Sequence, residues 1–280
     1  MEKERLNQET SKPIMVIAGT KDARKVAELL LTKGRRVMAT VTTPYGRELL
    51  SQLPGLEVHE GKLSEEALKA LVLEKEVEMV VDASHPFAEE VSRNAMKACL
   101  ETGVVYLRFE REETPWENLG DVTPVYSFEE AAQAMEGVLA REKGNAFLAI
   151  GTNHLPVFTE KREELRHRIF ARILPDSRMV VRCEAAGLAT GNILAMKGPF
   201  SESLNLEMMK YCQAAVLVTK ESGDTGGTRE KLQAAKKLGI PVILVKRPRI
   251  HYPEQVRSLE ALAAFLEHHD ILSDRCDDKD

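Results

Sequence analysis

The sequence lacks the features that mark membrane, secreted and zinc-binding proteins. No apolar run reaches the length of about 18 residues that a membrane-spanning helix requires. Residues 1–12 are polar and charged, so a secretory signal is not expected. The four cysteines are widely spaced and form no C-x-x-C pair. We therefore predict a cytoplasmic protein with reduced thiols, no metal site and no membrane association.

An excess of positive charge is also missing, since the formal net charge is −5 at pH 7. Bulk charge therefore gives no reason to expect a nucleic-acid partner, and an acidic small molecule would need cations gathered locally. What the chain does have is size and apolar content. With 280 residues, of which 43% are hydrophobic and 30% charged, it can form two domains, each with its own core.

Short apolar runs alternate with helical patterns in the first half of the chain. The run Ile14–Ala18 is continuous, as in a strand buried on both faces. Behind it, Ala23, Val26, Ala27 and Leu30 recur at the spacing of one helix face. Strands that alternate with helices predict a mostly parallel sheet. Further strands are predicted at 37–41, 57–59, 79–83 and 104–109.

The second half repeats this organisation after a break. Residues 112–124 carry prolines and a glycine among charged residues, which is typical of a linker. A helix is expected over Glu230–Leu238, ended by Gly239, and a terminal helix from Ser258 to about Glu267, with residues 268–280 frayed. Strands are predicted at 146–150, 168–174, 193–196, 216–219 and 242–245.

We therefore predict an α/β fold with two Rossmann-like lobes, mostly parallel sheets and a cleft between the lobes. A nucleotide-binding domain is expected over residues 13–113 and a substrate domain over residues 122–270. In such sheets, ligands bind beyond the carboxyl ends of the strands, at the point where the strand order reverses. The loops that follow the predicted strands are therefore the candidate sites.

The loop after the first strand is a candidate phosphate site, with Gly19, Thr20 and Arg24 as cofactor-binding residues. Gly19 lets the backbone approach a ligand closely, and N–H groups at a helix start can hold a phosphate. The three-glycine fingerprint of dinucleotide sites is absent, so a glycine needed only for a tight turn is equally compatible. The second strand ends in Thr42 and Thr43 without a carboxylate, and Arg47 follows, which favours NADPH over NADH.

The segment after the fourth strand supplies two further cofactor-binding candidates, Ser84 and His85. An acid–base pair of His85 with Asp82 is a possible interpretation of the same segment. The alternative is a helix cap followed by a packed phenylalanine. No G-x-S-x-G motif is present, so a serine hydrolase is not indicated.

Loops of the second half combine hydroxyls, amides, glycines and two lysines, a chemistry suited to carboxylates or phosphates. Flexible loops with solvated charges are the alternative. Arg108 and Arg111, at the exit of the fifth strand, are also predicted to bind carboxylates, unless they only pair with neighbouring glutamates. The loop candidates are Thr152, Asn153, His154, Lys197, Lys220, Ser222, Gly223, Gly226 and Gly227.

Taken in chain order, several of these segments resemble the precorrin-6A reductase family, including its cobalt-precorrin-6A form. The resemblance runs from about Met15 to Pro248 and depends on the ordered set, because no single motif in it is specific. The segments are AGTKDAR, DASHPFA, YLRFERE, IGTNHL, RILP, MKGPFS and LVTKESG with a glycine pair after it.

This resemblance implies a reductase of cobalamin biosynthesis that acts without metal or flavin. It would transfer a hydride from NADPH or NADH to one double bond of precorrin-6A or cobalt-precorrin-6A, giving the 6B form. The first lobe would hold the cofactor and the second the polycarboxylate corrin precursor. We predict Lys220 as the first candidate for the proton donor and His154 as the second. The alternatives are a two-lobe nucleotide-sugar transferase and a non-catalytic protein that closes over a small acidic ligand.

Overall fold

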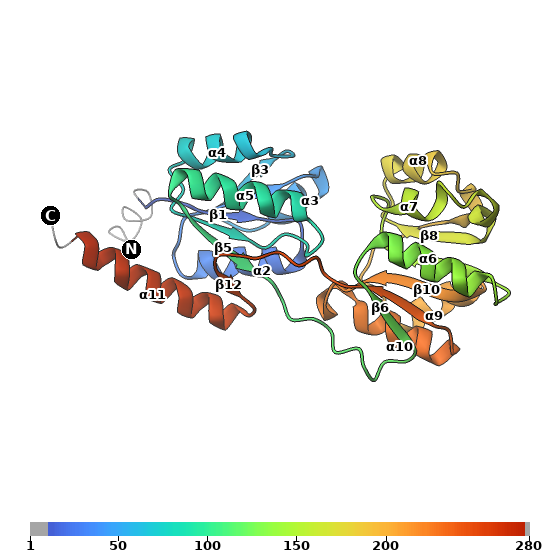
Figure 1. The fold of residues 1–280 in the computed structure, drawn as a ribbon. Coiled ribbons are helices and arrows are strands. Elements are labelled where there is room, and N and C mark those ends of the chain that lie inside the picture. The colour runs from blue at the N-terminus through green and yellow to red at the C-terminus, as the bar shows by residue number, and fades with distance from the viewer. Residues whose placement is uncertain (1–10, 278–280) are drawn as a thin grey trace. The chain divides into compact units, whose positions relative to one another are not determined.

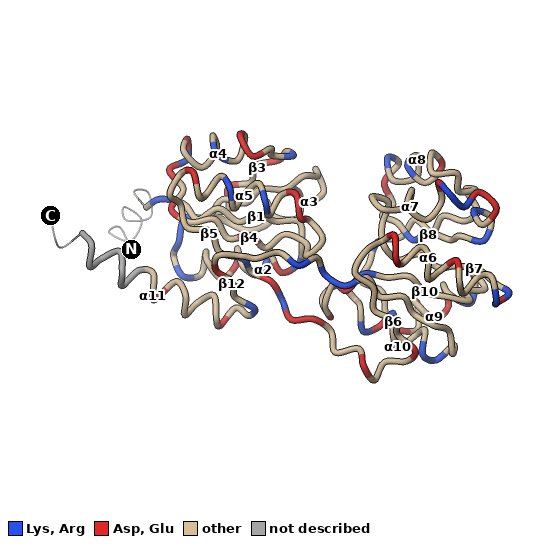
Figure 2. Tube along the Cα trace, in the orientation of Figure 1, with Lys and Arg blue, Asp and Glu red and all other residues tan. Residues whose placement is uncertain are grey.

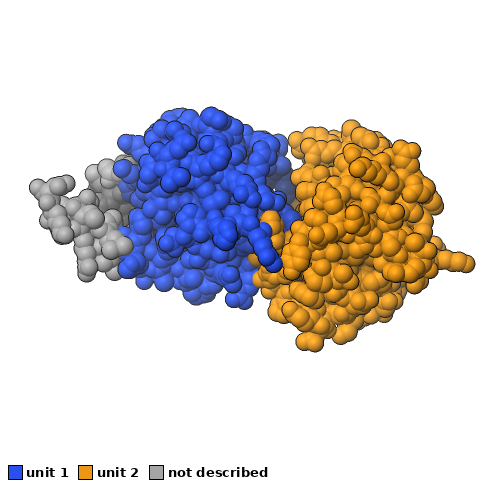
Figure 3. Space-filling view, viewed as in Figure 1, with its two compact units in different colours: residues 1–112, 249–280 blue, residues 113–248 orange. Residues whose placement is uncertain are grey.

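The computed structural model describes residues 11–277, which form two compact units (Figures 1 and 3). Unit 1 combines the chain up to Glu112 with the segment that begins at Arg249, and unit 2 is the continuous segment Glu113–Pro248. Each unit contains one six-stranded sheet with helices on both faces. The prediction of two Rossmann-like α/β lobes is therefore confirmed.

Unit 1 contains the first sheet, in which every strand pairing is parallel. The strand order β12-β5-β4-β1-β2-β3 reverses direction between β1 and β4, as in the doubly wound dinucleotide-binding fold. The central strands are fully buried apolar runs, because helices cover both faces of the sheet. The strands are β1 (Ile14–Ile17), β2 (Val37–Val41), β3 (Leu56–Glu60), β4 (Met79–Asp82), β5 (Val105–Phe109) and β12 (Gln255–Val256).

Two hydrophobic clusters hold the helices of unit 1 to the two faces of its sheet. Helix α2 (Lys21–Thr32) buries the stripe predicted from the sequence, and α11 (Leu259–Asp277) lies in the same cluster. The opposite face packs against α4 (Glu65–Glu74) and α5 (Glu89–Thr102). The short helix α3 (Pro44–Leu50) follows β2 and contacts β3.

The segment after unit 2 returns to unit 1 and completes its sheet. β12 pairs with β5, and Leu262 and Leu266 of α11 are buried in the cluster that contains α2. The predicted domain boundary is corrected accordingly, because residues 249–270 belong to unit 1 and not to the substrate domain. Helix α11 also continues to Asp277, so the predicted fraying from residue 268 is wrong as far as 277. Residues 278–280 lie outside the described residues.

Unit 2 contains a second all-parallel sheet with the order β6-β11-β10-β7-β8-β9. Its strands β9-β8-β7-β10-β11 repeat the order β3-β2-β1-β4-β5 of unit 1, with the reversal between β7 and β10. The strands are β6 (Val122–Val125), β7 (Asn145–Ala149), β8 (Ile169–Ile173), β9 (Ile193–Ala195), β10 (Ala214–Lys220) and β11 (Val242–Val245).

Helices α9 (Glu202–Tyr211) and α10 (Thr228–Leu238) cover one face of this second sheet. The helices seen on the other side in Figure 1 are α6 (Phe128–Leu139), α7 (Leu155–Thr159) and α8 (Ser177–Ala185). One expectation is wrong here, since part of the predicted linker, residues 122–124, belongs to strand β6. Pro124 is tolerated because β6 is an edge strand, where a missing N–H leaves no central ladder bond unmade.

Among the described residues, no helix is long and apolar enough to cross a membrane. The side chains described for residues 11–269 form no cluster of histidine, cysteine or carboxylate groups that could hold a metal ion. Cys99, Cys183 and Cys212 are buried thiols. Charges of both signs are spread over both units (Figure 2).

Candidate functional site

The loops after β1 and β4 lie side by side at the carboxyl edge of the first sheet, on either side of the strand-order reversal. The Thr20 hydroxyl accepts a 3.0 Å hydrogen bond from the Ala23 N–H, which caps α2, and donates to the Ala83 carbonyl at 2.9 Å. Gly19 is exposed with φ +118°, and a side chain there would meet no atom within 4 Å. The space beside Gly19, at the start of α2, is therefore open. The first N–H groups of this helix have no acceptors within the helix.

Two arginines brace the start of α2. Arg111 forms an ion pair with Asp22, a buried residue in the first turn of the helix. Arg24 pairs with Glu28 at 2.9 Å and donates to the Leu49 carbonyl at 3.0 Å. Arg111, predicted to bind substrate, therefore contacts the loop predicted to bind the cofactor, and its charge offsets the Asp22 carboxylate at the helix start.

The end of β2 presents hydroxyl groups and an arginine. Thr42 and Thr43 are exposed, and the Thr43 hydroxyl caps α3 by accepting a hydrogen bond from the Gly46 N–H at 3.1 Å. Arg47 is 60% exposed and lies 3.8 Å from Glu60 at the end of β3. No carboxylate follows β2 directly.

The buried ion pair of Arg108 with Asp82 changes the interpretation of two predicted roles. Both side chains have no exposure, and the Arg108 guanidinium lies 2.9 Å from the Asp82 carboxylate. It also donates to the Ser84 hydroxyl at 3.1 Å. Arg108 thus holds the β4 loop in place, which corrects its predicted role in substrate binding. The carboxylate of Asp82 is occupied by this network, so the suggested acid–base pair with His85 is not formed.

His85 remains at the ligand edge of the sheet. Its Nδ1 accepts a hydrogen bond from the Phe87 N–H at 3.2 Å, and the ring lies 5.8 Å from the Phe87 ring. A neutral ring held in this way carries its proton on Nε2. The contact with Phe87 therefore fixes the orientation of the histidine, whereas no side chain caps the start of α5. The cofactor-binding role of His85 stays a prediction.

The loop after β7 occupies the equivalent position in unit 2. Gly151 has φ +77°, and the buried Thr152 hydroxyl lies 3.1 Å from the Met179 sulfur. The exposed Asn153 accepts a hydrogen bond from Arg182 at 3.0 Å. His154 stacks on the Phe128 ring with a centroid separation of 3.7 Å and an angle of 7°. Three of the predicted residues are therefore contiguous here. Helix α8 contacts Thr152 and Asn153, and α6 contacts His154.

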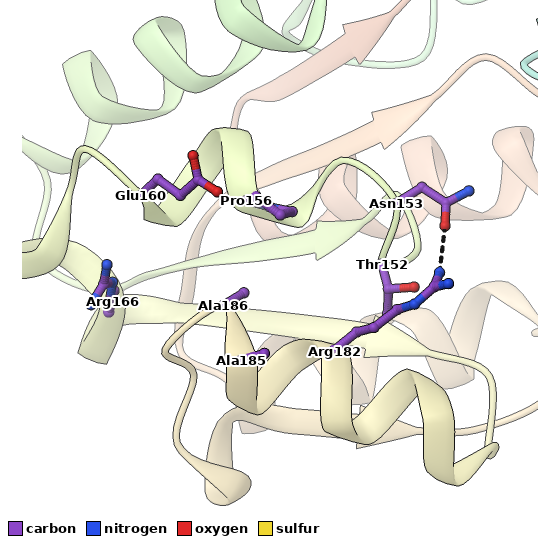
Figure 4. Close-up of a pocket in the computed structure, with 8 residues that line it drawn as sticks. All are labelled: Thr152, Asn153, Pro156, Glu160, Arg166, Arg182, Ala185 and Ala186. Atoms are coloured by element: carbon purple, nitrogen blue, oxygen red, sulfur yellow. Dashed lines mark hydrogen bonds between the residues drawn. The ribbon is translucent and has the colours of Figure 1, made fainter.

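Thr152 and Asn153 also line a pocket of about 530 Å³ within unit 2. Figure 4 shows that the pocket lies between α7 and α8, with Arg182 reaching from α8 towards Asn153. No role was predicted for its other lining residues, Pro156, Glu160, Arg166, Arg182, Ala185 and Ala186.

The loop between β10 and α10 brings together the predicted glycines and Ser222. The Ser222 and Thr228 hydroxyls are 3.2 Å apart, and Gly223 and Gly227 adopt positive φ angles of 70° and 71°. The Gly223 N–H donates to Glu221 at 2.9 Å, and Gly226 lies in the same tight turn. This loop is therefore compact and internally bonded, unlike the flexible loop considered from sequence.

Lysines follow two strands of the second sheet. Lys220 ends β10, and burial lowers its pKa to about 8. Lys197 is exposed in the loop after β9. Because all strands are parallel, the loops after β7, β9 and β10 share one edge, as predicted.

No role was predicted for two cations near this edge, the half-buried Arg172 and the buried Lys231. Arg172 lies in β8, on the strand face opposite the buried Ala171 and Ile173. Lys231 falls on the inward stripe of α10 with Thr228 and Leu232. A lysine at an apolar position of a helical stripe is the signal that could have revealed it.

Fold and site define a class of protein, one with two doubly wound units and a dinucleotide-type switch point in the first. The model of the precorrin-6x reductase CbiJ/CobK family matches residues 13–267. The chain belongs to this family. The predicted resemblance and the reductase role in corrin-ring synthesis are therefore confirmed.

Similar proteins support the same assignment over nearly the whole chain. A cobalt-precorrin-6A reductase of Priestia megaterium is 40% identical over 254 residues, covering 90% of this chain and 97% of the relative. A cobalt-precorrin-6A reductase of Methanothermobacter thermautotrophicus is 35% identical, covering 92% of this chain and 82% of the relative. The structure of CobK precorrin-6A reductase superposes with a TM-score of 0.72 at 25% identity, covering 92% of this chain and 98% of that one.

Proposed function

We propose that this protein is an NADPH-dependent cobalt-precorrin-6A reductase in which unit 1 binds the cofactor and unit 2 binds the macrocycle. The observation that carries the proposal is the switch point of unit 1, where the loops after β1, β2 and β4 converge. Sequence similarity to cobalt-precorrin-6A reductases, at 40% and 35% identity, supports the cobalt-containing substrate.

The residues of unit 1 fit a nicotinamide dinucleotide. Exposed Gly19 and the N-terminus of the 12-residue helix α2 offer N–H groups for the pyrophosphate. Ser84 and His85 stand across the switch point, where a ribose and nicotinamide belong in this fold. Thr42, Thr43 and Arg47 suit a 2′-phosphate, because no carboxylate directly follows β2 and Arg47 supplies a positive charge.

The chain's own contribution to the chemistry is positioning and proton delivery. A bound nicotinamide supplies the hydride that adds to one carbon of the double bond. The neighbouring carbon must gain a proton. Lys220 is our first candidate donor, because with its pKa lowered to about 8 it is still mostly protonated at neutral pH and gives up its proton more readily. His154 is the second candidate.

Thermal unfolding with NADPH, with NADH and with neither tests the cofactor assignment. We expect NADPH to raise the unfolding temperature more than NADH at equal concentration, because ligand binding to the folded state stabilises it. Thr42→Asp should reverse this order by placing a carboxylate where the 2′-phosphate would lie. If neither nucleotide shifts the transition but a polycarboxylate macrocycle does, the protein is a binding protein for an acidic ligand and the proposal fails.

A further inference from the structure

A cluster of cationic side chains lies on the second sheet, near the carboxyl ends of its strands. It consists of Arg172 in β8, Lys220 at the end of β10 and Lys231 in α10, and we call it the cation cluster. The pKa of Lys231 is lowered to about 7, first by burial and then by the charges of Arg172 and Lys220. Lys231 therefore lies near enough to Arg172 and to Lys220 to be affected by the charge of each.

Lys231 is the most deeply buried member of the cation cluster. Its side chain belongs to a residue that is only 4% exposed. Among residues 11–277, its ammonium group has neither a hydrogen bond nor an ion pair. A lysine is rarely buried without a partner, because removal of its charge from water is costly. The burial of Lys231 therefore does not stabilise the folded protein, and it requires another explanation.

Arg172 has a fixed orientation but no carboxylate partner among the described residues. Its guanidinium donates to the Asn205 amide oxygen at 2.7 Å. It also lies 4.2 Å from the centre of the Phe200 ring and 5.6 Å from that of Phe147. The guanidinium group has five N–H donors, of which Asn205 takes one. The side chain is thus held in place with donors to spare.

A buried hydroxyl group adds a third unused donor. Thr219 has no exposure, and its hydroxyl oxygen has no hydrogen-bond partner among the described residues. The register aligns Thr219 with Ala149 and Phe147 with Phe170. Thr219 and Arg172 therefore share the sheet face of Phe147, which is the face covered by α9 and α10.

Two carboxylates act on the charge of Lys231, and both belong to the same part of unit 2. Glu221 is already paired with Arg247 and accepts hydrogen bonds from two backbone N–H groups. Glu230 is the remaining carboxylate that acts on Lys231, and its Oε2 is buried without a partner within the described chain. Neither carboxylate forms an ion pair with Arg172 or Lys231 among the described residues.

We infer that Arg172, Thr219 and Lys231 bind a carboxylate side chain of the corrin precursor, next to Lys220. The identity of the ligand rests on the proposed function, which supplies a substrate with several carboxylates. Arg172 is suited to bidentate binding, and the threonine hydroxyl and the lysine ammonium complete the set of donors. Arg172 and Lys220 are only half-buried, so the cation cluster is open to the surface there.

Steady-state kinetics of the full-length protein test this assignment with Lys231→Met, which keeps the volume and removes the charge. We expect KM for cobalt-precorrin-6A to rise about tenfold to a hundredfold, because a charge-assisted hydrogen bond is lost. KM for NADPH should stay within about twofold, since α10 belongs to unit 2. Lys237→Met on the same helix is the matched control, because Lys237 is 64% exposed.

Proton uptake provides a second measurement that a structural role would not change. Lys231 is largely neutral above about pH 7, and a bound carboxylate would favour its charged form. Binding of cobalt-precorrin-6A without NADPH at about pH 8 should therefore take up protons, as measured by calorimetry in two buffers of different ionisation enthalpy. Lys220 can contribute to this uptake, so the decisive quantity is its decrease in Lys231→Met.

The outcomes separate this inference from the proposed function. If the wild type does not reduce cobalt-precorrin-6A, the proposed function fails. If the wild type is active but Lys231→Met leaves both KM and proton uptake unchanged, the substrate assignment of the cation cluster is wrong. Raised thermal stability of Lys231→Met together with raised KM would support it, because an uncompensated buried charge kept for binding destabilises the free protein.

Discussion

Arg108 and Asp82 form the ion pair on which the β4 loop depends. We expect Arg108→Met to lower the free energy of unfolding by about 3 to 5 kcal/mol, because the Asp82 carboxylate would be left buried and unpaired. Chemical denaturation measures the loss. Arg93→Met is the control, since Arg93 and Glu89 form an exposed pair of small expected effect, about 1 kcal/mol or less. Equal losses in the two variants would contradict the structural role of Arg108.

Lys220 should produce a characteristic dependence of the rate on pH. With its pKa lowered to about 8 by burial, it is a protonated donor below that pH and loses its proton as pH rises through it. We expect kcat to fall above about pH 8 and Lys220→Gln to lower kcat by about a hundredfold or more and remove this fall. The pH profile of kcat from about pH 6.5 to about 9.5 checks both effects. An unchanged kcat in the variant would transfer the role to His154.

Residue types alone could not separate the binding residues from the structural ones. Arg108 and Arg111 looked equivalent at the exit of β5, yet Arg108 has no exposure and Arg111 braces α2. The difference depends on the direction of each side chain from a strand whose register is fixed by its neighbours. Lys231 was overlooked because a lysine in an amphipathic helix is usually solvated.

At the scale of elements, unit 1 depends on a helix that follows unit 2 in the sequence. Leu262 of α11 has no exposure, and we expect Leu262→Ala to cost unit 1 about 2 to 5 kcal/mol of stability through the cavity it leaves. Leu100→Ala is the control, because Leu100 is 85% exposed. The single tryptophan, Trp116, belongs to unit 2 and can report on it separately.

We therefore expect Leu262→Ala to shift the unfolding transition seen by circular dichroism and to leave the fluorescence transition of Trp116 in place. Urea titrations of the two variants and the wild type give both signals. A shift of the tryptophan transition as large as that of the circular dichroism transition would show that α11 stabilises both units.

The elements predicted well were those with a strong local pattern. Continuous apolar runs identified β1, β2, β4 and β11 to within about one residue, since buried parallel strands need little else. β12 has two residues, and its pairing with β5 depends on contacts that are distant in sequence. The edge strand β6 contains a proline, which is a linker signal unless the strand is known to lie at an edge.

At the scale of the whole molecule, the division of labour between the units can be tested directly. We expect NADPH to slow amide hydrogen exchange around Gly19–Arg24, 42–47 and 83–87 in unit 1, because a bound ligand suppresses local opening. Unit 2 should be unaffected by NADPH alone. Hydrogen-exchange mass spectrometry resolves the two units, and protection confined to residues 113–248 would place the cofactor in the wrong unit.

The order of the units along the chain follows from the local pattern as far as Pro248. After Pro248, no sequence pattern shows whether the last helix packs on unit 2 or returns to unit 1. Helix α11 would be amphipathic in either case. The predicted boundary at residue 270 therefore followed sequence proximity, whereas the core of unit 1 determines where α11 packs.

The return of the chain to unit 1 also affects how the protein is made. During translation, unit 2 is synthesised completely before β12 and α11 exist. Until then, β5 has no partner strand at the edge of the first sheet that β12 will cover. An unpaired edge strand invites pairing with other chains. The β5 edge of the nascent protein therefore stays open to such pairing throughout the synthesis of unit 2.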